Sequence, residues 1–421
     1  MLQFNKIFRF CERKHIMNIK KEQLEFLDWE FGVFFHFGIR TFYEGHKDWD
    51  MREMPVEGFC PTELDCEDWA KAAAEAGAKY AILVTKHHDG FANWPSKYTE
   101  YSVKNTPWKD GKGDVVREFT DACRKYGLKV GLYYSPAQFG SVKMDPHEYD
   151  DYFINQVSEL LTDYGKIDYI WFDGCGSEEH KYDEQRIVDA IRELQPGILI
   201  FNMWDPDTRW VGNESGVAPS PSPLTVSELE FSVLTDEKAA LNEAHFLPVE
   251  CDCMMRLNNW FYSENDEDTV KSVDELMGLY LYSIGRGANL LINIGPDRRG
   301  LLPDKDKKAL LGLGEAIRRF NASEIACGRE DKSDTCFDIT LDQQPVNNVI
   351  LTEEIDGESE IGEFEIKVHP FSYGAPITVY RGTTIGHKAI CSFPTIRAKR
   401  ITVSFDKPKK VSAKVLYLPL Y

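Results

Sequence analysis

Two carboxylic acids of the sequence stand where a ligand pocket can use them. Asp173 ends an otherwise apolar run, residues 168–174 (DYIWFDG), and Gly174 beside it permits close approach of a ligand. Glu214 lies in residues 209–223, a stretch rich in Gly, Ser and Pro. Two carboxyl groups on opposite sides of a bound sugar are what hydrolysis of a glycosidic bond requires. Structural alternatives stay open for both: a helix N-cap or buried ion pair for Asp173, and a solvated surface acid for Glu214.

Three histidines belong to similar apolar runs. His36 lies in the sequence GVFFHFG, and His87 and His88 end the sequence YAILVTKHH. Imidazoles hydrogen-bond hydroxyl groups and also bind metal ions. No H-E-x-x-H motif occurs and no third ligand stands at a recognised spacing, so a metal site is the less favoured hypothesis. Adjacent residues of a strand point to opposite faces, so His87 and His88 can share one pocket only if the backbone turns there, as Gly90 permits.

A third polar group comprises Glu250, Asp252 and Arg256. The first two end another apolar run, residues 246–252 (FLPVECD). An arginine can hold a neighbouring carboxylate ionised, so Arg256 is a candidate partner for a catalytic acid. The spacing alone favours the alternative of a surface ion pair.

The apolar runs predict the elements that must position these residues. They are residues 32–38, 80–88, 129–135, 168–174, 198–204, 246–252 and 288–295. Near-continuous hydrophobicity is typical of parallel strands buried on both faces. Amphipathic segments predict helices between several of them, at residues 65–76, 114–126, 145–164, 183–194, 269–284 and 305–320. Because polar residues end nearly every run, and no G-x-G-x-x-G follows the first, we predict an α/β fold with a (β/α)8-like TIM barrel, its eighth strand unassigned.

The chain beyond about residue 327 has a different pattern. Alternating segments such as FDITLD, GEFEIKVH and KRITVSFD follow one another without helices between them. This pattern predicts a C-terminal antiparallel β-sandwich. We therefore expect a catalytic barrel over residues 17–325 and a β-sandwich domain over residues 333–421.

Composition narrows the class of protein and of partner. The 421 residues, 43% hydrophobic and 28% charged, are typical of a soluble globular protein. The net charge of -20 argues against nucleic acid and anionic membranes as partners. The ten cysteines are scattered and form no C-x-x-C motif. The residues before an alternative start at Met17 contain no apolar core of a signal peptide. Both observations predict a cytoplasmic protein. The oligomeric state is not predicted.

Longer matching stretches carry a resemblance to a known family. They are FGVFFHFG (31–38), AGAKYAILVTKHHDGFANWPS (76–96), GLKVGLYYS (127–135), IDYIWFDG (167–174) and GANLLINIGPDRRG (287–300). In this order they resemble the α-L-fucosidases of glycoside hydrolase family 29, over nearly the whole chain. The resemblance implies an enzyme that hydrolyses terminal fucose from fucosylated oligosaccharides or glycoconjugates, with no metal and no cofactor.

The resemblance also implies roles for individual residues. Asp173 matches the nucleophile of a retaining mechanism and Glu214 the acid/base catalyst, so their carboxyl groups are expected about 5–5.5 Å apart. Glu250 is the second candidate for the acid/base role. The positions that match the substrate-binding pocket of the family are His36, Asp48, Trp49, His87, His88, Tyr134, Arg256 and Trp260.

Two stretches bear on the linkage that would be cleaved. RWVGNESG (209–216) and VECDCMMRLNNWFYSENDED (249–268) resemble the subfamily that prefers branched, Lewis-type α-1,3/4-linked fucose. Two alternatives stay open: a fucosidase of broader tolerance for α-1,2, α-1,6 or aryl fucosides, and a fucose-binding protein without catalysis.

Overall fold

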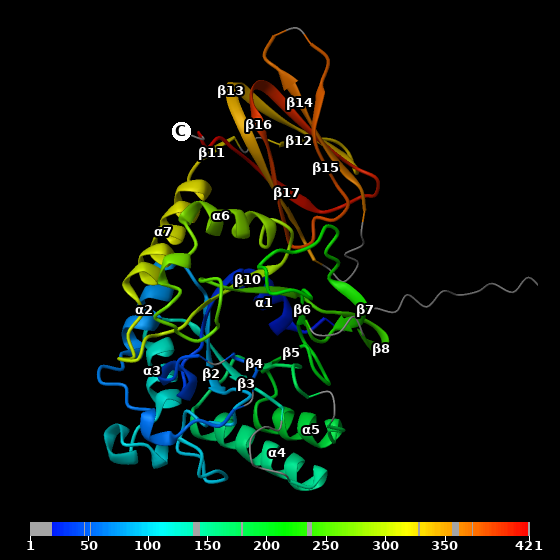
Figure 1. The fold of residues 1–421 in the computed structure, drawn as a ribbon. Helices are drawn as coiled ribbons and strands as arrows, with labels where there is room; N and C mark the ends of the chain where they lie inside the picture. The colour runs from blue at the N-terminus through cyan, green and yellow to red at the C-terminus, as the bar shows by residue number, and fades with distance from the viewer. Residues whose placement is uncertain are drawn as a thin grey trace, which may run out of the picture.

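The fold comes from a computed structural model (Figure 1). It describes residues 19–45, 47–50, 52–137, 144–177, 180–233, 238–326, 329–355, 362–372 and 374–419; the alternative start at Met17 lies outside them. Eight parallel strands follow the order β5-β4-β3-β2-β1-β10-β9-β6. They are β1 (Phe31–Phe35), β2 (Tyr80–Lys86), β3 (Lys129–Tyr134), β4 (Tyr169–Phe172), β5 (Leu199–Phe201), β6 (Arg209–Trp210), β9 (Val249–Met254) and β10 (Asn289–Ile294). A parallel bridge between Phe201 and Thr208 nearly closes the ring, which confirms the predicted barrel.

The strand that the apolar pattern did not reveal is β6. It is two residues long, too short to show any periodicity, and it begins the Gly-, Ser- and Pro-rich segment that was expected to be a loop. An antiparallel hairpin of β7 (Thr225–Glu230) and β8 (Lys238–Phe246) follows β6 where a regular barrel would have a helix.

Seven α-helices are found in the described part of the chain, six of them connecting or following the barrel strands. They are α1 (Lys21–Trp29), α2 (Cys66–Ala76), α3 (Val115–Lys125), α4 (Pro146–Asp163), α5 (Glu184–Leu194), α6 (Val273–Tyr282) and α7 (Asp304–Asn321). Short 3-10 helices lie at Ile39–Phe42, Val56–Gly58, Val103–Asn105, Trp108–Gly111 and Glu267–Thr269. The carboxylates of Asp65, Asp114 and Asp183 cap α2, α3 and α5 by accepting a backbone N–H hydrogen bond. None of the described helices is both long enough and apolar enough to cross a membrane.

Helix α1 closes one end of the barrel. Its Phe26 packs against Tyr169, with ring centroids 5.3 Å apart, and its Trp29 against Tyr80, at 5.4 Å. Tyr80 and Tyr169 are the first residues of β2 and β4, so α1 lies at the N-terminal end of the strands. The C-terminal end is left for a ligand, as is usual for this architecture.

The C-terminal strands form one antiparallel sheet. Two of its strands are long and belong to both halves of the sheet. Its order is β11-β17-β13-β16-β14-β15, with β12 paired to β13. The strands are β11 (Glu324–Ala326), β12 (Arg329–Ser333), β13 (Cys336–Glu353), β14 (Phe364–Pro370), β15 (Ile377–Gly382), β16 (Lys388–Phe405) and β17 (Val411–Leu416). Register shifts divide β13 and β16, and the apolar side chains of both halves belong to one core, as a sandwich requires.

This β-domain packs directly on the barrel, above α6 and α7 in Figure 1. The N–H of Ile390 donates to the carbonyl of Gly285, just after α6, over 2.9 Å. Three apolar residues of the β-domain belong to the same buried cluster as the outer core of the barrel: Ile350, Ile390 and Leu416.

Candidate active site

A cavity of about 190 Å³ opens at the C-terminal ends of the barrel strands. It collects residues from β1, β3, β4, β5, β6 and β9 and from loops at the ends of the strands, including the loop after β2. All the site residues predicted from the sequence line it except Tyr134 and Arg256: His36, Asp48, Trp49, His87, His88, Asp173, Glu214 and Trp260. Residues from distant parts of the chain therefore converge on one pocket.

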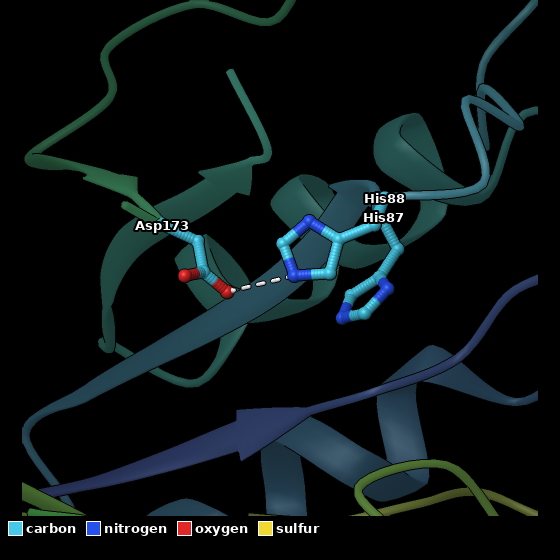
Figure 2. A group of neighbouring side chains, drawn as sticks. All are labelled: His87, His88 and Asp173. Atoms are coloured by element: carbon cyan, nitrogen blue, oxygen red, sulfur yellow. Dashed lines mark ion pairs between the residues drawn. The ribbon is translucent and has the colours of Figure 1, made fainter. Parts of the chain in front are cut away.

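Asp173 directly follows β4, and its carboxylate is held by neighbouring donors. The hydroxyl of Tyr133 donates to Oδ2 over 2.8 Å and the N–H of Cys175 donates to Oδ1 over 2.9 Å. Nε2 of His88 lies 3.3 Å from Oδ2 (Figure 2). Burial acts to raise the pKa of Asp173, but the charge interaction with His88 and these hydrogen bonds outweigh it, so the pKa is lowered. Asp173 is thus tuned to remain a carboxylate.

Glu214 is tuned in the opposite direction. It lies at the mouth of the cavity, where its side chain stays accessible to solvent. Burial by the surrounding protein, followed by the negative charges of Asp173 and Asp48, raises the pKa of Glu214 to about 7. A hydrogen bond from the Trp260 side chain opposes this shift. Near neutral pH Glu214 can therefore both donate and accept a proton.

His36 faces the cavity as a neutral imidazole. Its Nδ1 lies 2.7 Å from Oδ1 of Asn293, and burial, the main cause, lowers its pKa to about 3. Nδ2 of Asn293 also donates to the carbonyl of Trp260 over 2.7 Å. Asn293 thus fixes His36 and Trp260 relative to one another, a role that the sequence analysis did not assign to it.

His87 and His88 both reach the cavity because they lie beyond the regular part of β2. The strand ends at Lys86, after a register shift that follows Val84, so the alternation of faces no longer applies. Nδ1 of His88 lies 2.6 Å from the Ser135 hydroxyl. Three possible ligand atoms, one each from His87, His88 and Asp173, lie within 4.8 Å of one another (Figure 2). Residues at this spacing can hold a metal ion.

Tyr134 does not reach the cavity, which corrects the prediction that it binds substrate. Tyr134 is the last residue of β3, and its side chain is fully buried on the outer side of the barrel, where its hydroxyl donates to Oε1 of Gln156 over 2.7 Å. Its neighbour Tyr133 lines the cavity instead. Successive residues of a strand face opposite sides. Choosing the neighbouring tyrosine therefore selects a side chain of the outer core in place of one that lines the pocket.

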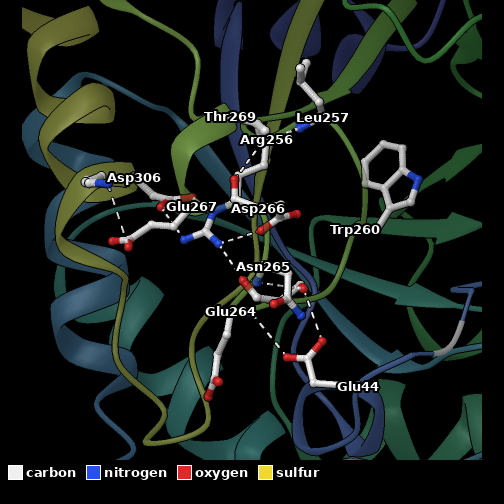
Figure 3. A network of polar contacts seen from close by, with 12 residues as sticks. Glu44, Arg256, Leu257, Trp260, Glu264, Asn265, Asp266, Glu267, Thr269 and Asp306 are labelled. Atoms are coloured by element: carbon white, nitrogen blue, oxygen red, sulfur yellow. Dashed lines mark hydrogen bonds and ion pairs between the residues drawn. The ribbon is translucent and has the colours of Figure 1, made fainter.

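Arg256 does not contact Asp173, which corrects its predicted role. Its guanidinium is buried and binds Asp306 and Asp266, each over 2.8 Å, together with the carbonyl of Ser263 (Figure 3). The contacts with Asp266 and Ser263 fold the segment after β9 back on itself. The same segment carries Trp260 into the cavity. Arg256 thus acts on the shape of a pocket wall and not on the charge of the carboxylate.

Several lining residues were missed by the sequence analysis or given no role. They are Tyr133, Trp171, Cys175, Phe201, Asn202, Trp210, Phe231, Ser232, Val233 and Asp252. Asp252 accepts a hydrogen bond from the Trp210 indole over 2.7 Å, and burial, together with the charge of Glu214, raises its pKa well above the usual range. Its place at the end of an apolar run was a usable signal, whereas nothing in the sequence marks Trp210 or Phe231.

Glu250 lies inside the barrel and does not line the cavity. Tyr80 and Trp171 donate to its carboxylate over 2.5 and 2.9 Å, and burial raises its pKa to about 7. Its position in the closed half of the barrel makes it a poor candidate for proton transfer to a ligand.

We expect Arg256→Met to lower the free energy of unfolding by about 3–5 kcal/mol, because it leaves Asp266 and Asp306 buried without their cation. Chemical denaturation measures this loss. The matched control is Arg299→Met, since Arg299 is an exposed arginine that binds Asp297, and we expect no resolvable change from it. Equal stability of the two variants would contradict the assignment of Arg256 as a structural clamp.

Comparison with known proteins assigns the family. The alpha-L-fucosidase family model matches residues 55–321. Alpha-L-fucosidase 1 of Arabidopsis thaliana is 29% identical over 448 residues, covering 94% of this chain and 86% of that protein. The crystal structure of a glycoside hydrolase 29 family member from an unknown rumen bacterium is 31% identical, with a TM-score of 0.85, over 96% of this chain and 78% of that one. A Ruminococcus gnavus GH29 fucosidase in complex with fucose shares the fold at 22% identity, with a TM-score of 0.80, over 96% of this chain and 95% of that one. The chain described here therefore belongs to the alpha-L-fucosidase family and is a glycoside hydrolase.

Proposed function

We propose that this enzyme is a retaining exo-α-L-fucosidase in which Asp173 is the nucleophile and Glu214 the general acid and base. The observation that carries this proposal is the opposite tuning of two carboxyl groups that line one pocket. The pKa of Asp173 is lowered and that of Glu214 is raised to about 7. Such a pair supplies one permanent anion and one proton carrier near neutral pH.

The first step forms a fucosyl ester. A carboxylate oxygen of Asp173 attacks the anomeric carbon while the bond from that carbon to the leaving oxygen breaks. Glu214 transfers its proton to the leaving oxygen, so the rest of the glycan departs as an alcohol. Because the pocket is closed toward the interior of the barrel, a terminal sugar suits it better than an internal one.

The second step uses water in place of the glycan alcohol. Glu214, now a carboxylate, takes a proton from the water as its oxygen attacks the anomeric carbon. The ester bond to Asp173 breaks, and fucose leaves with its anomeric configuration retained. Both carboxyl groups then return to their starting protonation states.

The charge of the pocket supports this chemistry. Glycosidase transition states carry positive charge on the sugar ring. Among the described residues that line the cavity there are four carboxyl groups, from Asp48, Asp173, Glu214 and Asp252, and no lysine or arginine. The carboxylate of Asp173, whose pKa is lowered, supplies negative charge that stabilises this positive charge as it develops, whereas the raised pKa values of Glu214 and Asp252 favour their protonated forms.

For the substrate we propose branched glycans with α-1,3/4-linked fucose. The two stretches whose sequences resemble that subfamily, residues 209–216 and 249–268, supply Trp210, Glu214, Asp252 and Trp260 to the lining of the cavity. Residues of both subfamily-like stretches therefore line the cavity in which we propose that the glycan binds.

Matched trisaccharides test the linkage. We expect the purified protein to release fucose from Lewis a and Lewis x trisaccharides much faster than from 2'-fucosyllactose, because residues 209–216 and 249–268 resemble the subfamily that prefers branched, α-1,3/4-linked fucose. Free fucose is measured by chromatography. Equal rates on all three would leave a fucosidase of broad tolerance, whereas no release from any of them, or from an aryl fucoside, would leave a fucose-binding protein.

Replacement of the two acids separates their roles. We expect Asp173→Ala to abolish turnover of every fucoside, since no nucleophile remains. We expect Glu214→Ala to lose about 10²–10⁴-fold on a Lewis trisaccharide but much less on an aryl fucoside whose leaving group needs no proton. Added azide should restore turnover of the aryl fucoside by Glu214→Ala. Wild-type activity of Glu214→Ala on the trisaccharide would assign the proton to another residue, with Asp252, which also lines the cavity, to be tested next.

A pair of adjacent tyrosines tests how Asp173 is kept ionised. Activity requires Asp173 as a carboxylate, so it is lost as the pH falls through the pKa of Asp173. Tyr133→Phe removes a donor to that carboxylate, which raises this pKa and moves the acid limb of kcat/KM to higher pH. Tyr134→Phe removes only a hydrogen bond to Gln156, so its acid limb should match the wild type. Identical acid limbs in all three proteins would contradict the assignment.

A further inference from the structure

The three residues of Figure 2 have the spacing of a transition-metal site. Zinc binds nitrogen and oxygen ligands at about 2.0–2.2 Å, which places the ligand atoms of a tetrahedron about 3.3–3.6 Å apart. Nε2 of His88 and Oδ2 of Asp173 already stand 3.3 Å apart. A ligand atom of His87 lies within 4.8 Å of the other two, so the three residues can bind one ion once His87 moves closer to His88 and Asp173.

Neighbouring side chains orient two of these ligands, His88 and Asp173, as in known metal centres. Nδ1 of His88 lies 2.6 Å from the hydroxyl of Ser135, which leaves Nε2 directed toward Asp173. The hydroxyl of Tyr133 holds the carboxylate from another side. Ligands fixed by outer hydrogen bonds lose little freedom when a metal binds, and such partners commonly contribute about 10–100-fold to affinity.

The surroundings favour a cation that comes from solvent. The side chain of Asp173 is 25% exposed, and the cavity brings further carboxyl groups, from Asp48, Glu214 and Asp252, near the three ligands. Two imidazoles and a carboxylate suit zinc, cobalt or nickel, whereas magnesium prefers six oxygen ligands. A fourth position toward the cavity would be left for water.

We propose that His87, His88 and Asp173 form an inhibitory site for zinc and similar divalent ions, which compete with fucose for the pocket. The metal takes up the carboxylate and the imidazoles that the sugar needs, so bound metal and bound sugar exclude one another. Metal binding itself does not depend on the reaction; only the competition rests on the proposed function.

Direct binding is the first test. Titration calorimetry of the purified enzyme with ZnCl2 should show one site per chain, and CoCl2 should give the visible absorption of a four- or five-coordinate cobalt. Saturating fucose should displace either ion. Asp173→Asn, which preserves the shape of the side chain, should weaken zinc binding at least about tenfold, and Ser135→Ala should weaken it about 10–100-fold.

Two control variants address adventitious binding. His147→Gln breaks an exposed pair in which Nδ1 of His147 lies 3.5 Å from Asp151, and Cys60→Ser removes an exposed thiol. Neither residue lines the cavity, so both variants should bind zinc as the wild type does. A loss of zinc binding in either control, with binding retained in Asp173→Asn, would overturn the proposal.

Kinetics is the second test. Zinc should raise KM for an aryl fucoside and leave kcat unchanged, EDTA should reverse the effect, and equal MgCl2 should have none. Lowered kcat at constant KM, or no zinc binding at all, would refute the inhibitory site. Hydrolysis by a protein that does not bind zinc would refute the metal site and leave the fucosidase proposal intact. Zinc binding by a protein that hydrolyses no fucoside would refute the fucosidase proposal and leave the metal site intact.

Discussion

The site depends on keeping the Asp173 carboxylate ionised within a largely buried pocket whose described lining contains no lysine or arginine. Burial alone would protonate it, and the compensation comes from His88, the hydroxyl of Tyr133 and the N–H of Cys175. Neutral and weakly basic donors leave the pocket with an excess of negative charge. That excess favours the positively charged sugar ring of a glycosidase transition state, whereas an arginine in contact with Asp173 would oppose it.

The opposite wall of the pocket is fixed by stronger ionic contacts placed outside it. Arg256 lies in the segment that carries Trp260 and binds Asp266 of the same segment and Asp306 of α7 (Figure 3). Asn293 joins the backbone of Trp260 to His36. Full charges thus hold the backbone of the wall, while only uncharged or acidic groups of the described lining face the ligand. This separation keeps the positive charge of Arg256 away from the reacting carbon.

The sequence was sufficient for the barrel, the family and most of the pocket, because apolar runs that end in polar residues mark the strands and their functional ends. It failed for Tyr133 and Tyr134, since β3 is buried on both faces and its apolar pattern does not show which tyrosine points inward. It failed for β6 because two residues carry no period. Arg256 was misplaced because sequence proximity to Glu250 and Asp252 does not show that its partners lie on α7 and in the segment after β9.

The shared packing of barrel and β-domain has a consequence for biosynthesis. Ile350, Ile390 and Leu416 complete a buried cluster whose other members belong to the barrel, although β17 follows every barrel element in the chain. During translation the barrel therefore emerges with an apolar face uncovered until the last strand leaves the ribosome. We expect the nascent barrel to need chaperone protection over this interval, and truncation before β17 to yield aggregates in place of a smaller active enzyme.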